Sequence, residues 1–265
     1  MYTHNLNPIL LDIGVLEIRW YSLAYIFGIL IGWWMGKKIL AFRADSYKIL
    51  IKEEFDNLIS YLIIGIILGG RIGYVIFYNL AFYLDNPLEI FKIWGGGMSF
   101  HGALVGVILS TYYFCNFNGR KYSSLLLLDI IACVTPVGLF FGRIANFINA
   151  ELYGKPTDVY WSVIFPMVDN IPRHPSQIYQ ALLEGVVLFI ILFSFSLKRK
   201  IYTGVCSSIF LIFYGIFRII SEQFREPDIQ IGYLYKQISM GSALSLIMIL
   251  VGSFLLINIK KNAPK

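Results

Sequence analysis

The side chains of this sequence best suited to chemistry are a few arginines and one histidine that interrupt apolar stretches. The arginines are Arg71, Arg143, Arg218 and Arg225, and the histidine is His101. Ionisable groups inside apolar segments are costly and are usually functional. Guanidinium groups offer a planar set of donors that fits phosphate oxygens, and an imidazole exchanges protons near neutral pH. Because no serine triad or metal-ligand spacing accompanies them, they favour a displacement in which a phosphate leaves, with no metal or other cofactor.

The chain that carries these groups is far more apolar than a soluble globular protein. Apolar residues make up 57% of it and charged residues 14%, whereas soluble domains carry about 25% charge. A membrane-spanning helix needs about 20 mostly apolar residues. Seven segments qualify and predict an all-α integral membrane protein with seven transmembrane helices, at roughly residues 20–36, 57–79, 97–117, 123–142, 176–197, 201–221 and 237–259.

The lysines and arginines between these segments predict their orientation. Thirteen lie on one side of the predicted spans and seven on the other, and basic loops are cytoplasmic. The N-terminus is then periplasmic and the C-terminus cytoplasmic, in a multi-pass protein of the bacterial inner membrane. The basic residues fall in short clusters between apolar runs, so the net charge of +6 does not indicate a nucleic-acid partner.

One polar stretch stands out from the spans, at residues 144–175. It is too long and too polar for a simple connector. We therefore predict a single polytopic membrane domain over residues 1–265, with a small external cap at roughly 144–175 inserted between the fourth and fifth spans.

The ionisable groups of five predicted spans fall at one depth. With a rise of about 1.5 Å per residue, all of them lie in the outer leaflet or its headgroup zone. They are Arg71, His101, Arg143, Glu184 and the group Arg218, Glu222 and Arg225. This arrangement predicts a polar cavity, open to the outer face or sideways to lipid, at the periplasmic leaflet.

Each of these residues also has a structural interpretation. His101 lies in the segment GGGMSFHGALVG, where glycines leave room for a ligand, but a histidine there could equally be a packing residue. Arg71 could bind a ligand or could anchor its span to an acidic residue, either Glu184 or Glu222. Two further arginines could extend to the membrane interface as long basic side chains do, namely Arg143 and Arg225.

Six sequence blocks resemble the bacterial prolipoprotein diacylglyceryl transferases. They occur in family order over about 80% of the chain. The fourth block matches the family signature. The blocks are RWYSLAY (19–25), GGRIGYVIFYN (69–79), GGGMSFHGALVG (95–106), GRIANFINAELYG (142–154), RHPSQIYQALLEG (173–185) and FRIISEQFREPD (217–228).

The resemblance implies a reaction and its partners. The diacylglyceryl group of phosphatidylglycerol would pass to the lipobox cysteine thiol in the signal peptide of a prolipoprotein. The products would be a thioether and glycerol phosphate, in the first step of bacterial lipoprotein maturation. The protein would act among membrane lipids and would need no cofactor.

The resemblance also implies functional positions, namely Tyr21, His101, Arg143, Asn146, Glu151, Gly154 and Arg225. Together with the residue types above, it leads us to expect a catalytic group of His101, Arg143 and Arg225. We expect a substrate-binding group of Tyr21, Arg71, Asn146, Glu151, Gly154 and Glu222. His101 is either the base that takes the thiol proton or a substrate ligand, because nearby arginine charge also favours the thiolate.

Two other classes of function would use the same arginines. A transporter or flippase for an anionic lipid needs access from both faces, and the inner halves of the spans hold few charges beyond Asp129. A non-catalytic lipid-binding assembly factor needs no proton-transfer residue, so a requirement for His101 would argue against it.

Overall fold

The computed structural model describes residues 1–14, 17–43, 52–93, 96–117, 122–198, 201–228, 231–236 and 238–262. Several residues used to predict the orientation lie outside these ranges, namely Lys48, Arg120, Lys121, Arg199, Lys200 and Lys265.

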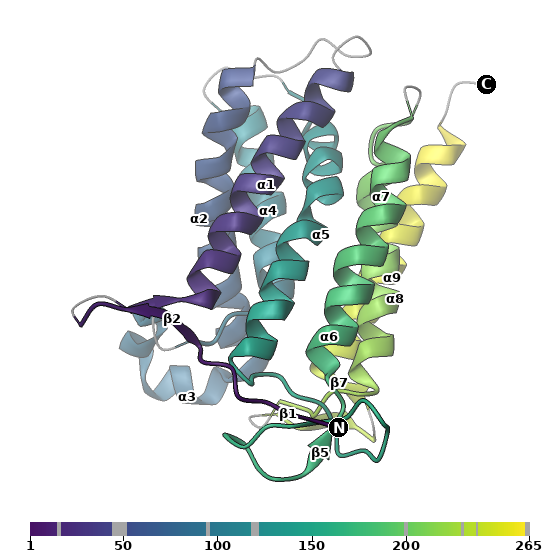
Figure 1. The fold of residues 1–265 in the computed structure, drawn as a ribbon. Coiled ribbons are helices and arrows are strands. Elements are labelled where there is room, and N and C mark those ends of the chain that lie inside the picture. Colours follow the sequence, from purple (N-terminus) through teal and green to yellow (C-terminus); the bar gives the residue numbers. More distant parts are fainter. Residues whose placement is uncertain are drawn as a thin grey trace.

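Long helices form an elongated bundle, with the strands at one end and the C-terminus at the other (Figure 1). Six apolar helical segments of the described chain are long enough to cross a membrane, which makes this an integral membrane protein. They lie in α1 (Trp20–Arg43), α2 (Lys52–Tyr78), α5 (Ser124–Ile148), the continuous helix Ser176–Ser196, α8 (Val205–Glu222) and α9 (Met240–Lys261). The predicted segment 97–117 is α4 (Phe100–Asn116), a shorter apolar helix of 17 residues.

The helix Ser176–Ser196 is not α-helical throughout. It begins as α6 (Ser176–Gln180), continues as the π-helical segment η4 (Ala181–Val187), and ends as α7 (Leu188–Ser196). Two short helices, α3 (Leu80–Asp85) and η2 (Pro87–Phe91), follow α2.

The strands are short and form three small sheets. In the first, β1 (Tyr2–Thr3) pairs in parallel with β4 (Val163–Ile164), which pairs antiparallel with β5 (Pro172–Arg173). β2 (Ile9–Asp12) pairs antiparallel with β3 (Glu17–Arg19), and β6 (Tyr233–Tyr235) with β7 (Ile238–Ser239). Next to the first sheet, the buried side chains of Ala150, Val163 and Phe165 form a small apolar cluster. The centroid of the His4 ring lies 5.3 Å from the ring centroids of both Phe147 and Phe165.

Glycines set the spacing between helices α2 and α4. A Cβ atom on Gly106 would lie 1.9 Å from the carbonyl oxygen of Gly65, and one on Gly102 would lie 2.3 Å from that of Gly69. Side chains at these positions would force the two backbones apart, so the close approach requires glycine. These glycines therefore set the distance between the two helices.

A polar contact joins the bundle at the end opposite the strands. The buried Asp129 carboxylate of α5 accepts hydrogen bonds from the backbone nitrogens of Gly204 and Ser207, both at 2.7 Å. These groups begin α8, whose free N–H groups need acceptors. Asp129 therefore caps a neighbouring helix.

Candidate active site

Two spans are joined by a buried ion pair near the end of the bundle that carries the strands. Arg143, in the last turns of α5, donates from Nε and Nη2 to Oε2 of Glu184, at 3.1 and 2.9 Å. Glu184 lies within η4 and is fully buried. A lone buried carboxylate would be very costly, so each partner stabilises the charge of the other.

The same carboxylate continues the network to α8. Glu184 Oε1 lies 3.7 Å from Nη1 of Arg218, and Arg218 Nη2 lies 2.5 Å from Oε1 of Glu222. Arg218 and Glu222 are four residues apart on α8, so they share one face of the helix. Glu222 also accepts a hydrogen bond of 2.7 Å from Ser239 Oγ, the N-cap of α9.

Arg225 closes the network just beyond α8. Its Nη1 donates to Glu222 Oε1 at 3.2 Å and its Nη2 to Asp228 Oδ1 at 2.5 Å. Ion pairs therefore run from Arg143 through Glu184, Arg218 and Glu222 to Arg225. The predicted convergence of Arg143 and Arg225 on one polar region is present, with Arg218 between them.

The network leaves guanidinium donors free for an anion. Three guanidinium groups pair with three carboxylates, of which Glu184 and Glu222 are buried. Asp228 lies at the edge, with 31% of its side chain exposed. Within the described chain, buried nitrogens without a hydrogen-bond partner remain on Arg218 (Nε, Nη1) and Arg225 (Nε). Free guanidinium donors suit the oxygens of a phosphate ester.

His101 lies beside this network in the first turn of α4, whose N-cap is Ser99. The imidazole is buried, and neither ring nitrogen has a hydrogen-bond partner in the part of the chain described. It interacts electrostatically with Arg218 and Glu222. A packing histidine usually satisfies at least one ring nitrogen, so the two unpartnered ring nitrogens favour the ligand-binding or proton-transfer interpretation.

A second polar group lies next to Arg143. Asn146, one turn further along α5, donates from Nδ2 to Oε2 of Glu151 at 3.2 Å and to the Tyr21 hydroxyl at 3.5 Å. The Glu151 backbone nitrogen donates to the Asn146 carbonyl at 2.9 Å. Three of the predicted residues are thus brought together, from α1, α5 and the segment that follows α5.

Gly154 contributes backbone and no side chain. Its nitrogen donates to the His174 carbonyl at 3.1 Å, and on the other side Glu226 N donates to Tyr153 O and Lys155 N to Phe224 O. Residues 153–155 therefore run between two other segments, and Gly154 pairs directly with Arg225. A Cβ on Gly154 would lie 2.2 Å from the His174 oxygen, so only glycine fits.

Arg173 ties these segments together. Its guanidinium donates to both Asp169 oxygens, to the Gly154 carbonyl at 3.0 Å and to Glu226 Oε2 at 3.1 Å. These hydrogen bonds hold the Asp169 pKa below its ordinary value. The sequence block that contains Arg173 pointed to this position, but the role of the side chain depends on contacts across the fold.

Arg71 is set apart from the other arginines. Its five N–H groups donate to backbone carbonyls of Glu89, Ile90, Lys92, Gly96 and Gly97, at 2.6–3.2 Å. One alternative is wrong: Glu184 and Glu222 pair with other arginines, so Arg71 does not anchor its span to them. Its donors have backbone partners in the fold, and substrate binding by Arg71 stays a prediction.

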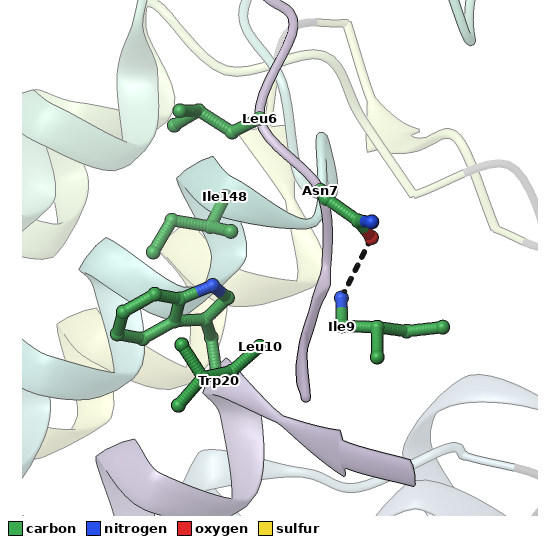
Figure 2. A pocket seen from close by; sticks show the side chains of 6 residues that line it. All are labelled: Leu6, Asn7, Ile9, Leu10, Trp20 and Ile148. Atoms are coloured by element: carbon green, nitrogen blue, oxygen red, sulfur yellow. Dashed lines mark hydrogen bonds between the residues drawn. The ribbon is translucent and has the colours of Figure 1, made fainter. Parts of the chain in front are cut away.

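An apolar hollow of about 260 Å³ lies between the N-terminal segment and the adjoining ends of α1 and α5. Figure 2 shows Trp20, Ile148, Leu6 and Leu10 facing it. The Ile9 backbone nitrogen donates to the Asn7 side-chain oxygen at 2.9 Å at its rim. The hollow contains none of the charged groups, so it is a neighbouring apolar surface and not the anion site itself.

Comparison with known proteins agrees with this geometry. The family model for prolipoprotein diacylglyceryl transferase matches residues 8–258. Proteins named phosphatidylglycerol–prolipoprotein diacylglyceryl transferase are 51% identical in Ehrlichia canis (94% of each chain covered) and 51% identical in Rickettsia felis (95% of this chain, 96% of the relative). The corresponding protein of Rickettsia typhi is 50% identical over 97% of this chain and 98% of its own. This chain belongs to the prolipoprotein diacylglyceryl transferase family.

Proposed function

We propose that this protein transfers the diacylglyceryl group of phosphatidylglycerol to the lipobox cysteine thiol of a prolipoprotein. The observation that carries the proposal is the buried arginine network with its unpartnered guanidinium donors. Phosphatidylglycerol has one negative charge, on a phosphodiester. The printed names of the relatives support the same lipid and the same class of acceptor.

The reaction is a displacement at the glyceryl carbon next to the phosphate. The cysteine thiolate forms the new C–S bond while the C–O bond to phosphate breaks. The electron pair goes to the phosphate oxygen, and glycerol phosphate leaves with a second negative charge. Arg143, Arg218 and Arg225 stabilise that growing charge, and one well-placed donor is worth about 3 kcal/mol.

The thiol must first lose its proton, because a free cysteine has a pKa near ~8.5. His101 is the proposed base, since its ring nitrogens are unpartnered beside Arg218. Tyr21, Asn146 and Glu151 bind substrate next to Arg143. Glu222 orients Arg218 and Arg225, and Gly154 holds the segment that pairs with Arg225.

The proposed topology is a single membrane domain over residues 1–265 with seven spans, in which α4 crosses with the six longer segments. The N-terminus and the cap at roughly 144–175 face the periplasm, and the C-terminus faces the cytoplasm of a bacterial inner-membrane protein. Supporting this, His101 begins α4 whereas Arg143 and Glu222 end α5 and α8, so antiparallel helices bring these residues to one end. Asp129, which a flippase would use in the inner half, caps α8 instead.

The test is a transfer assay with purified protein in lipid nanodiscs and a lipobox peptide. With phosphatidylglycerol, mass spectrometry should find a diacylglyceryl group on the peptide cysteine and glycerol phosphate in solution. A peptide with serine in place of cysteine should stay unmodified, and phosphatidylethanolamine should react poorly because its ammonium adds positive charge. Lipid movement across liposomes without any modified peptide would reject the transferase in favour of a flippase.

A further inference from the structure

The buried acid of η4 has a role that its position in the sequence does not indicate. Glu184 is fully buried, as are Gln177 and Gln180 on the preceding turns. Within the α6–α7 helix the hydrogen-bonding pattern changes to π over residues 181–187. Such insertions are rare, turn the side chains around the helix axis, and are frequent at functional sites.

Gly185 shows why the carboxylate meets α5 at this point. A Cβ on Gly185 would lie 2.7 Å from Phe140 Cβ and 3.0 Å from Phe140 Cα. The π-helical segment therefore approaches the α5 backbone as closely as glycine allows. Phe140 is one turn before Arg143 on α5, so this contact brings the neighbouring Glu184 onto the Arg143 guanidinium.

The two carboxylate oxygens of Glu184 interact with different arginines. Oε2 accepts from both Nε and Nη2 of Arg143, which leaves Nη1 of Arg143 outside this pair. Oε1 lies 3.7 Å from Arg218 Nη1, too far for a hydrogen bond. Glu184 thus fixes the plane of one guanidinium and attracts a second without occupying its donors.

The charge of Glu184 matters as much as its hydrogen bonds. Without it, three guanidinium groups would face the buried carboxylate of Glu222 and the partly exposed one of Asp228. The network would then carry one more positive charge and would hold a doubly charged glycerol phosphate more tightly than a singly charged lipid. Such binding stabilises the product and slows its release, and only preferential stabilisation of the transition state accelerates a reaction.

We infer that Glu184 is a positioning residue of the transferase. It fixes Arg143 of α5, attracts Arg218 of α8 and limits the positive charge of the network so that glycerol phosphate can leave. This inference rests on the proposed transfer reaction.

The test compares Glu184→Gln, Glu184→Asp and the surface control Glu17→Gln in the nanodisc assay. Glu17 pairs with Arg19 on the exposed strand β3, away from the network. For Glu184→Gln, we expect kcat to fall on the order of 10- to 100-fold, because misplaced guanidinium groups lose alignment. The KM for phosphatidylglycerol should not rise. Added glycerol phosphate should inhibit at a concentration about 10-fold lower, because one more positive charge acts on it.

Glu184→Asp separates the effect of the negative charge from the effect of side-chain length. Its carboxylate keeps the charge but is one methylene shorter, so kcat should fall less than in Glu184→Gln while inhibition by glycerol phosphate stays near the wild-type value. Glu17→Gln should match wild type throughout. If Glu184→Gln does not fold, Glu184→Asp decides alone: a lowered kcat with unchanged inhibition supports the inference, and an unchanged kcat overturns it.

Other outcomes overturn the inference or the underlying function separately. A Glu184→Gln variant with wild-type kcat and inhibition overturns the positioning role. So does a loss of kcat that comes with a raised KM and a lowered melting temperature, because that pattern indicates a purely structural role. If wild type itself forms no modified peptide in the same assay, the proposed function fails, whatever the variants do.

Discussion

Replacing Gly154 by alanine is the sharpest test of how the segment outside the bundle controls the site. The added Cβ would lie 2.2 Å from the His174 carbonyl oxygen and 2.8 Å from that of Phe224. Carbon–oxygen contacts settle at about 3.3 Å or more, so residues 153–155 must move by about 1 Å relative to His174. The backbone conformation at Gly154 is not among the left-handed ones, so the effect is steric and not a matter of glycine's flexibility.

The size of the effect follows from what this movement disrupts. Forcing a methyl group into a filled space costs about 1–3 kcal/mol. The movement also strains the hydrogen bonds from Gly154 N to His174 O, Lys155 N to Phe224 O and Glu226 N to Tyr153 O. Arg225 lies between Phe224 and Glu226 and must shift with them. A displacement of about 1 Å at a reacting group costs about 100-fold in rate, so we expect kcat/KM to fall by about that factor.

The assay is peptide transfer at saturating and limiting phosphatidylglycerol, with a thermal melt of the same preparation. Gly138→Ala is the matched control, because its Cβ meets nothing within 4 Å and alanine is the better helix former. It should keep wild-type activity and an equal or higher melting temperature. Wild-type kcat/KM in a folded Gly154→Ala protein would refute the reasoning, and so would an equal loss in Gly138→Ala.

Three further predictions test other parts of the site. His101→Gln should lower kcat and remove the pH dependence that a base confers, whereas a near-normal rate with an unchanged pH–rate profile would exclude His101 as the base. Arg71→Gln should lower the melting temperature by several degrees, since hydrogen bonds to five carbonyls are lost, with little change in the KM for phosphatidylglycerol; a large rise in KM alone would identify Arg71 as a substrate ligand. The folded pKa of Asp169 is depressed by Arg173, so its contribution to stability is present above the unfolded pKa of about 4 and is lost as the pH falls further. Asp169→Asn should therefore melt below wild type at pH 7 and approach it near pH 3, and a gap that is equal at both pH values would contradict this.

The sequence predicted which polar residues lie close together better than it predicted the partner of each one. The arginines at the ends of apolar segments, the residues brought beside Arg143, and the family were all within reach of composition, spacing and resemblance. Arg71 shows where this reasoning stops. It has the same residue type and the same depth as Arg143, yet it binds backbone carbonyls and Arg143 binds a buried acid. Depth follows from position within a span, but a partner depends on how each helix is rotated.

Glu184 was predicted to lie at the same depth as the arginines, but its only suggested partner was Arg71. The π-helical segment that turns it toward α5 has no sequence signature, because α- and π-helical turns use the same residue types. The contact of Gly185 with Phe140 became visible only in the fold. Arg173 likewise lies within one of the six sequence blocks, but its hydrogen bond to Glu226 joins residues 53 positions apart, which the sequence does not indicate.

By itself, the sequence determined that the chain is a membrane protein, that its charged groups lie near one end of the spans, and that it resembles lipid-dependent transferases. Hydropathy and motifs are local properties, so they can be read along the chain. The tertiary structure alone decided that Arg218 lies between Arg143 and Arg225, that Gly154 serves through its backbone, and that Arg71 holds a loop. Each of these outcomes depends on distances of a few ångströms between segments far apart in the sequence, where a side chain pairs with whichever group the packing of helices brings within reach.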